Sequence, residues 1–308
     1  MFLIDVLSNN PSLTTRITIG SFDGLHAGHQ TIIHRLVSEA HCQEQKAVVI
    51  TFFPNPAVFL KKIQTPYYLT TNTEKAALLQ QMGVDQTIIL PFNQELAQSS
   101  AESFISNLQR QLRFNTIYIG YDFHFGANRE GDATKLKGLG EKYGFKVHVQ
   151  DPISFQASPI SSSLIRKFIS DGNVADLYPL LNRWYSLMGE VIHGDGRGKK
   201  LGIPTANISF ESQKLLPPNG IYATRIHVDA EVRPAAVSIG FRPTFYDAPI
   251  TKTVEAFILD WDQNIYGKMV TLEFVRKLRD EIQYENAQAL TAQIEKDILL
   301  TRKIIEHE

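Results

Sequence analysis

The chain has 308 residues, 43% of them hydrophobic and 20% charged, which predicts two folded domains rather than a disordered chain. Lysine and arginine number 31 against 32 acidic residues, so the formal net charge of -1 excludes a broadly basic nucleic-acid coat. The single cysteine, Cys42, excludes an internal disulfide and any zinc or iron–sulfur site built from several cysteines. No apolar run approaches the roughly 20 residues that span a bilayer, and the N-terminus lacks the features of a signal peptide. We therefore expect a soluble cytoplasmic protein.

Strands and helices alternate in the first half of the chain. Strands are expected at 16–19, 46–53, 86–90, 116–120 and 145–149, and helices at 26–40, 72–82, 101–112 and 134–143. The run KAVVITFF at 46–53 is apolar and β-branched, as a strand covered on both faces requires. We expect Asn72 or Thr73 to cap the helix that ends before Gly83. This alternation predicts an α/β domain with a doubly wound, Rossmann-like parallel sheet and a ligand crevice at the carboxyl ends of its strands.

The pattern changes near residue 184, where short alternating strands replace the strand–helix alternation. Strands are expected at 186–193, 220–228, 233–239, 253–259 and 269–275, with glycine- and proline-containing turns between them, and a helix at 287–305. The sequence therefore predicts a small antiparallel β-barrel with a C-terminal helix. The expected domains are residues 1–184 and 185–308.

A glycine- and histidine-rich segment follows the first strand and opens the first helix. Its notable residues are Gly20, Phe22, Asp23, Gly24, His26, Gly28 and His29. Glycines allow the backbone to approach a phosphate, and free N–H groups at a helix start favour an anion. Two histidines three residues apart share one face of the first turn, where they can stabilise charge that develops on an α-phosphate. Alternatively, paired histidines cap a helix or bind a metal.

This segment resembles the His-x-Gly-His motif of the nucleotidyltransferase superfamily, in the version found in bacterial FAD synthetases. Those proteins are bifunctional riboflavin kinase/FMN adenylyltransferases, and the similarity extends over essentially the whole chain. The resemblance implies a nucleotidyltransferase domain followed by a riboflavin kinase domain. It implies catalytic roles for His26 and His29 and nucleotide binding by the remaining motif residues.

Two further segments resemble parts of the same adenylyltransferase site. The first contains Asp122, Phe123, Phe125 and Arg129, and it resembles the segment on the flavin side of that site. Aromatic rings beside glycine can hold a planar ring and an arginine can meet a phosphate, although phenylalanines at a strand end are equally typical of a core. The second contains Ser162, Ser163 and Arg166 and resembles the family's motif that binds ATP phosphates; alone it would be only a helix cap.

A second glycine-rich stretch lies at the start of the expected barrel and includes Gly194, Gly196 and Gly198. It lacks the spacing of a Walker loop, but a flexible glycine-rich loop can wrap phosphates with its backbone N–H groups. Alone, it is more typical of a mobile surface loop. The following Pro-Thr-Ala-Asn resembles a riboflavin kinase motif, which implies that Thr205 and Asn207 supply oxygen ligands to Mg²⁺.

One carboxylate, Glu255, stands in an otherwise apolar expected strand, where an acid costs stability unless it is solvated, paired or used. The family resemblance implies that Glu255 is the base for the riboflavin 5′-hydroxyl and that Arg279 lies in the segment that closes over flavin. The family commonly has an acidic residue and a histidine in the segment 52–56, where this chain has Phe53 and Asn55 instead, and Ser238 stands where an asparagine is usual. Asn55 retains hydrogen-bonding groups, so we expect it to contact nucleotide.

Three functions remain open at this point. The first is a bifunctional enzyme that phosphorylates riboflavin and adenylylates FMN, with ATP and Mg²⁺. The second is a riboflavin kinase with a degenerate first domain, and the third is a flavin- or nucleotide-binding regulator without turnover. The expected partners are riboflavin, FMN and ATP, with neither nucleic acid nor membrane, and weak self-association is left open.

Overall fold

The computed structural model describes residues 14–64, 66–194, 203–241 and 252–308. The chain divides into two compact units, Met1–Ser162 and Ser163–Glu308, and each is described by itself. Residues 163–184 are therefore grouped with the second unit by compactness. The functional boundary expected after residue 184 stays a prediction.

A five-stranded parallel sheet forms the centre of the first unit. Its order is β3-β2-β1-β4-β5, with bounds β1 Thr15–Ile19, β2 Lys46–Phe53, β3 Gln86–Pro91, β4 Phe114–Gly120 and β5 Lys146–Gln150. The chain builds outward from β1 to β3 and then returns to place β4 on the other side of β1. This order confirms the doubly wound sheet and puts its topological switch point between β1 and β4.

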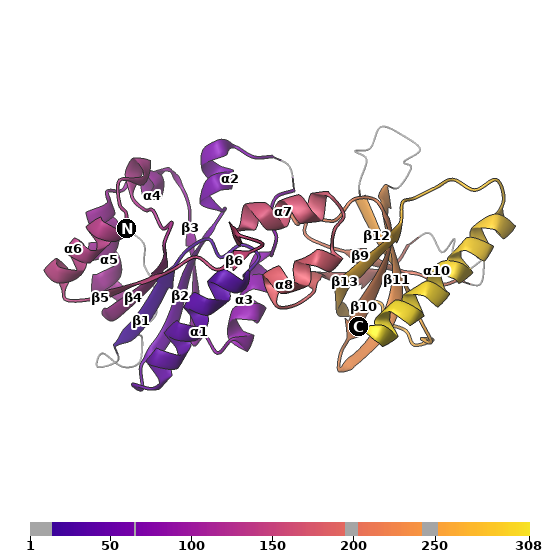
Figure 1. Cartoon of the computed structure of the whole chain (residues 1–308), viewed down its shortest axis with the longest axis horizontal. Helices are drawn as coiled ribbons and strands as arrows, with labels where there is room; N and C mark the ends of the chain where they lie inside the picture. Colours follow the sequence, from indigo (N-terminus) through magenta and orange to yellow (C-terminus); the bar gives the residue numbers. More distant parts are fainter. Residues whose placement is uncertain (1–13, 65, 195–202, 242–251) are drawn as a thin grey trace. The chain divides into compact units, whose positions relative to one another are not determined.

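Helices cover both faces of this sheet (Figure 1). The helices of the first unit are α1 Ala27–His41, α2 Pro56–Lys61, α3 Asn72–Gln81, α4 Gln94–Gln98, α5 Ala101–Leu112, the short 3₁₀ turn η1 Ala127–Arg129 and α6 Ala133–Tyr143. One apolar core joins α5 and α6 to the sheet, and a second joins α1 and α3 to the opposite face. A two-stranded ribbon, β6 Ser154–Phe155 and β7 Ser158–Pro159, completes the unit.

The strand β2 shows why this sheet is apolar throughout. Val48 and Ile50 pack into the core beneath α5, whereas Ala47 and Val49 pack beneath α1. All four are completely buried, so alternate residues enter opposite cores. This arrangement confirms the expectation of a strand covered on both faces.

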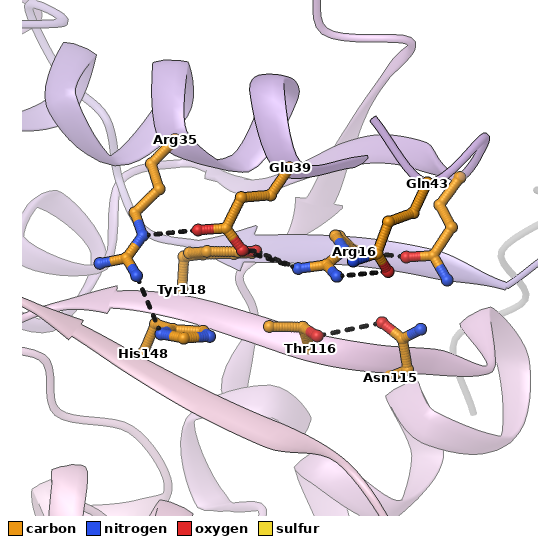
Figure 2. A network of polar contacts seen from close by, with 9 residues as sticks. Arg16, Arg35, Glu39, Gln43, Asn115, Thr116, Tyr118 and His148 are labelled. Carbon is orange, nitrogen blue, oxygen red and sulfur yellow. Dashed lines mark hydrogen bonds and ion pairs between the residues drawn. The ribbon is translucent and has the colours of Figure 1, made fainter. Parts of the chain in front are cut away.

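A partly buried polar network joins the C-terminal half of α1 to the sheet (Figure 2). The Arg16 guanidinium on β1 donates to Glu39 Oε2 over 2.9 Å, and the Tyr118 hydroxyl on β4 donates to the same oxygen over 2.6 Å. The outer end of the network is the His148 ring of β5, which stacks on Tyr118 and accepts from Arg35. Burial raises the pKa of Glu39, but the hydrogen bonds from Arg35 and Tyr118 together lower it by more. The pKa of Glu39 therefore lies below the usual value.

The second unit contains a closed antiparallel barrel with the order β10-β11-β12-β9-β8-β13. Its strands are β8 Tyr185–Ile192, β9 Ala206–Ser209, β10 Gly220–Val228, β11 Glu231–Phe241, β12 Lys252–Ile258 and β13 Met269–Arg279. The helix α7 Ser162–Ser170, the turn η2 Ala175–Leu177 and α8 Tyr178–Leu181 precede the barrel, and α10 Ala287–His307 follows it. Figure 1 shows α10 running along the barrel, where it contacts β10, β11 and β13. The expected barrel and terminal helix are confirmed.

The start of α3 differs from the sequence prediction. The cap is Thr71, not Asn72 or Thr73: its Oγ1 accepts from the Glu74 backbone N–H over 3.2 Å, and Glu74 Oε2 accepts from the Thr71 N–H over 2.9 Å. This reciprocal pair is a capping box. The sequence distinguishes this cap, because Glu74 stands three residues after Thr71, whereas neither Asn72 nor Thr73 has an acidic residue at that spacing.

Candidate active sites

The histidine segment and the segment containing Asp122 meet at the switch point of the parallel sheet. The first follows β1 and the second follows β4, and these two strands are hydrogen-bonded neighbours. A side-chain oxygen of Asp122 lies 3.2 Å from the position that a Cβ on Gly120 would occupy, so the carboxylate returns to the end of β4. Loops at this place form the ligand crevice of doubly wound sheets.

His26 and His29 form a stacked pair at the start of α1. Their ring centroids are 3.6 Å apart with an angle of 19° between the planes, and His26 Nδ1 accepts from the His29 backbone N–H over 3.4 Å. His26 is therefore the N-cap of α1. A Cβ on Gly28 would lie 3.3 Å from the His26 ring, so this glycine leaves space for the stacked imidazole. The capping role that the sequence left as an alternative is present together with the paired rings.

The His29 imidazole is uncharged near neutral pH. Burial is the main cause that holds its pKa well below the usual value, and the neighbouring charges of His26 and Lys75 lower the pKa further. The Phe22 ring meets His29 edge-on at 5.2 Å, and His29 Nδ1 is buried without a hydrogen-bond partner among the described residues. An uncharged imidazole keeps one N–H group, so His29 can still donate a hydrogen bond to an anion.

Asp23 and Gly24 attach the histidine loop to the segment that precedes α3. Asp23 is buried, and its Oδ1 accepts from the backbone N–H groups of Leu69, over 2.9 Å, and Thr70, over 3.1 Å. The Gly24 N–H donates to Thr70 Oγ1, and at φ +82° a Cβ there would lie 2.8 Å from Leu69 Cδ1. Both residues thus shape the loop, and their expected contact with nucleotide stays a prediction. The same holds for Gly20, whose missing Cβ leaves space for the Phe22 ring.

Lys75 is a buried cation on α3 that the sequence analysis missed. Its side chain is 2% exposed, and its Nζ donates to the Ser21 carbonyl over 2.8 Å and to Thr51 Oγ1 over 3.2 Å. Burial lowers its pKa to about 8, and attraction to Asp23 opposes this shift only in part. The spacing to Leu79, four residues on and also buried, was the available signal, because it puts this lysine on the buried face of the helix.

Asn55 is used as a helix cap. Its Oδ1 accepts from the Ala57 N–H over 2.9 Å at the start of α2, and its own N–H donates to the Tyr68 hydroxyl over 3.0 Å. Asn55 is buried, with 6% of its surface exposed. Its expected contact with nucleotide stays a prediction, but one of its two polar side-chain atoms already has a structural role.

The aromatic segment after β4 holds two stacked rings and a cation. Phe123 and Phe125 have centroids 5.3 Å apart at 19°. Phe125 is buried and belongs to the core beneath α5, whereas Phe123 is partly buried against that core. Arg129 is exposed at the end of η1 and donates to His124 Nδ1 over 3.1 Å. The core role that the sequence left open thus applies to Phe125, and the expected contacts of Phe123 and Arg129 with flavin stay predictions.

The serine motif begins where the first unit ends. Ser162 Oγ donates to the Asp23 carbonyl over 2.8 Å, so this hydroxyl lies against the histidine loop. Ser163 is exposed and Arg166 is half-buried on α7, which belongs to the second compact unit after Ser162. Their expected contacts with ATP phosphates stay predictions.

A second set of polar residues meets where β9, β12 and the end of β8 approach one another. Asn207 of β9 pairs with Glu255 of β12 across the ladder, and Thr205 Oγ1 donates to Glu255 Oε2 over 3.1 Å. A Cβ on Gly194 would lie 2.1 Å from Asn207 Nδ2, so the backbone of this glycine lies directly against that amide. Four of the residues predicted for the second site are therefore neighbours, namely Gly194, Thr205, Asn207 and Glu255. The other predicted glycines of this loop, Gly196 and Gly198, lie outside the described residues.

Arg279 has a structural role in the second unit. Its Nε and Nη2 donate to the Asp297 carboxylate of α10, with the shortest contact at 2.7 Å, and Nη1 donates to the Asp280 carbonyl. Gln293 also donates to Asp297, which is 5% exposed. The expected approach of Arg279 to flavin stays a prediction, and the ion pair already joins β13 to α10.

Within the described residues, no cluster of three or more His, Cys, Asp or Glu side chains is arranged to hold a metal ion. The predicted Mg²⁺ ligands, Thr205 and Asn207, offer oxygen atoms, which this ion prefers, and their binding of Mg²⁺ stays a prediction. No helix in the part of the chain that the structure describes is long and apolar enough to cross a membrane.

Comparison with known proteins identifies two family matches along the chain. The FAD synthetase family model matches residues 9–164, and the riboflavin kinase model matches residues 181–305. A bifunctional riboflavin kinase/FMN adenylyltransferase of Buchnera aphidicola is 35% identical over 93% of this chain and 92% of its own length. Its counterpart in Escherichia coli K12 is 33% identical over 96% and 95%. A crystal structure from Streptococcus pneumoniae, described as a macrolide-efflux protein, matches with TM-score 0.83 and 27% identity over 95% of both chains.

Proposed function

Since the chain belongs to the family of bifunctional riboflavin kinase/FMN adenylyltransferases, we propose that it makes FAD in two steps at two separate sites. The barrel unit transfers the γ-phosphoryl group of ATP to the 5′-hydroxyl of riboflavin and forms FMN. The parallel-sheet unit joins FMN to the AMP part of a second ATP and releases pyrophosphate. The observation that carries the proposal is the presence of a separate polar site in each unit.

In the adenylyltransferase site, an oxygen of the FMN phosphate attacks the α-phosphorus of ATP. A P–O bond forms there while the bond from the α-phosphorus to the β-phosphate bridging oxygen breaks, and pyrophosphate carries away the negative charge. No side chain needs to act as nucleophile, so catalysis consists of positioning and stabilisation of charge. His26 and His29 supply N–H donors to the equatorial oxygens of the α-phosphate, and their stacking fixes the direction of both rings.

In the kinase site, Glu255 accepts the proton of the riboflavin 5′-hydroxyl as its oxygen bonds to the γ-phosphorus of ATP. The bond from that phosphorus to the β–γ bridging oxygen breaks, and ADP leaves. Thr205 Oγ1 donates to Glu255 Oε2, which holds the carboxylate in one orientation and leaves the other oxygen for the substrate proton. Thr205 and Asn207 would hold Mg²⁺, whose charge offsets that of the ATP phosphates. The Gly194 backbone lies against Asn207, where its N–H group can meet a phosphate oxygen.

The ligands of the proposal are riboflavin, FMN, ATP and Mg²⁺. All are small and polar, which agrees with sites built from backbone loops and single polar side chains. We place both reactions in the cytoplasm, where ATP is available.

Flavin chromatography tests the proposal and separates it from the alternatives. The full chain is incubated with riboflavin, ATP and Mg²⁺, and the products are resolved. FAD supports two activities, FMN alone supports a kinase with a degenerate first unit, and unchanged riboflavin supports a regulator without turnover.

Two variants test the assignment of one reaction to each unit. His29→Ala removes a donor to the α-phosphate, so FAD formation from FMN should fall by about 10²–10³-fold while riboflavin phosphorylation is retained. Glu255→Gln removes the base, so phosphorylation should fall by about 10²–10⁴-fold while supplied FMN is still adenylylated. The exposed His34 and Glu190 provide matched controls, His34→Ala and Glu190→Gln, which should change neither rate. Loss of both reactions in either folded variant would contradict the assignment.

A further inference from the structure

Lys75 connects three elements of the adenylyltransferase site. From α3, its ammonium group bonds the Ser21 carbonyl in the histidine loop and Thr51 Oγ1 on β2. Thr51 Oγ1 itself donates to the same Ser21 carbonyl over 3.0 Å. Two donors from two elements therefore fix one peptide group, five residues before His26.

The segment that carries Lys75 is fixed to the same loop at a second place. Asp23 accepts from two backbone N–H groups just before α3, and Gly24 donates to the Thr70 hydroxyl. The Thr71–Glu74 capping box then fixes the direction in which α3 leaves this segment. The position of Lys75 relative to the loop is thus set by several hydrogen bonds and not by the lysine alone.

A buried lysine needs an explanation, because an apolar side chain of similar size would avoid the cost of removing a charge from water. Asp23 is the nearby opposite charge, but attraction to it compensates for burial only in part. Lys75 also affects His29, because its charge is one of the causes that lower the pKa of that ring. The positive charge of Lys75 therefore disfavours protonation of His29.

We propose that Lys75 is a positioning residue of the adenylyltransferase site, which fixes the histidine loop through the Ser21 carbonyl. The inference rests on the proposed function of this site. Lys75 is buried beneath the loop, so it acts through Ser21 and His29 and not by contact with the substrates. Removal of its charge should make His29 easier to protonate, and removal of its hydrogen bonds should loosen the loop.

Two variants separate the charge from the hydrogen bonds. Lys75→Met removes both, whereas Thr51→Val removes only the hydroxyl that Lys75 and Ser21 share. Lys137→Met is the matched control, because Lys137 is exposed on α6. The full-length variants are assayed for FAD formation from FMN, ATP and Mg²⁺ between pH 5 and 9, and riboflavin phosphorylation is measured on the same samples as a control for the second unit.

In Lys75→Met we expect kcat for adenylylation to fall by about 10–100-fold, with a smaller change in KM for FMN, because misplaced groups lower turnover. The acidic limb of its kcat profile should move to higher pH. In Thr51→Val, kcat should fall while the acidic limb stays, because the charge is retained. The control should match the wild type, and phosphorylation should be the same in all four proteins.

The titration of His29, followed by NMR on histidine-labelled protein, gives a readout that does not depend on turnover. Its pKa should rise in Lys75→Met and not in Thr51→Val. A folded Lys75→Met with unchanged kcat and unchanged His29 titration would overturn the inference. If Lys75→Met does not fold, wild-type kcat in Thr51→Val would overturn it. Absence of FAD formation by the wild type would refute the proposed function instead, while the NMR titration would still test the effect of Lys75 on His29.

Discussion

The burial of Lys75 should make the stability of the first unit depend on alkaline pH. Its pKa is about 8 in the folded chain against 10.5 for an unperturbed lysine, and at about 1.4 kcal/mol per pH unit this difference corresponds to about 3 kcal/mol. Between pH 8 and 10.5 the unfolded chain binds more protons than the folded one, so stability rises with pH in that interval. Below pH 8 both states are protonated, and the folded state bears the whole cost of the buried charge.

Lys75→Met removes this titration, and its expected effect on the His29 pKa falls at more acidic pH than the interval from 8 to 10.5. The difference in unfolding free energy between Lys75→Met and the wild type should therefore shift by about 3 kcal/mol in favour of the wild type between pH 7 and 10.5. Urea unfolding measures it. Both tryptophans, Trp184 and Trp261, lie in the second unit, so their fluorescence follows that unit and far-ultraviolet circular dichroism detects the remaining transition. A difference that stays constant with pH would refute the reasoning, and Lys137→Met should show such a constant difference.

Two more predictions concern the second unit. Gly194→Ala places a Cβ 2.1 Å from Asn207 Nδ2, so the amide must move and riboflavin phosphorylation should fall by about 10²-fold. Gly138→Ala is the control, because its Cβ meets nothing within 4 Å. Equal phosphorylation rates in the two variants would contradict the proposed site. Asp297→Ala leaves the partly buried Arg279 without its ion pair and should destabilise the second unit by about 3 kcal/mol in urea unfolding followed by fluorescence. The exposed Asp171→Ala is its control, and a loss below about 1 kcal/mol would show that the pair contributes little.

The regular elements could be predicted because their hydrophobic period is strong. The bounds expected for 46–53, 101–112 and 220–228 agree with β2, α5 and β10 at both ends. The short helices α2 and α4, with six and five residues, were not predicted, because so few residues complete no periodic pattern. The four-residue strand β9 was recognised only as a motif, since its identity as a strand depends on pairing with β8 and β12.

Side-chain roles were harder to predict than elements, because several residues of the motifs also have structural partners. Asn55 and Arg279 show this: a helix cap and an ion pair to α10 were not visible in the sequence. Lys75 shows the converse, since it lies outside any recognised motif and becomes notable only when Ser21 and Thr51 are brought to it from 54 and 24 residues away. Spacing identifies a local motif, but contacts between distant segments depend on the whole fold.

The polar network of Figure 2 holds the C-terminal half of α1, whereas a loop holds the start of the same helix. Arg16 and Tyr118 hold Glu39, and with it the C-terminal half of the helix, to two strands of the sheet. The other end is joined to a loop in which Phe22 and Leu25 adopt positive φ angles of 44° and 42°. The helix is therefore held at both ends, at its C-terminal half by side chains of the sheet and at its start by a loop that Asp23, Gly24 and Lys75 fix. Substitutions near Glu39 should therefore change mainly the melting temperature, and substitutions in the loop before α1 should change mainly kcat. The two ends of one helix are thus under different evolutionary constraints.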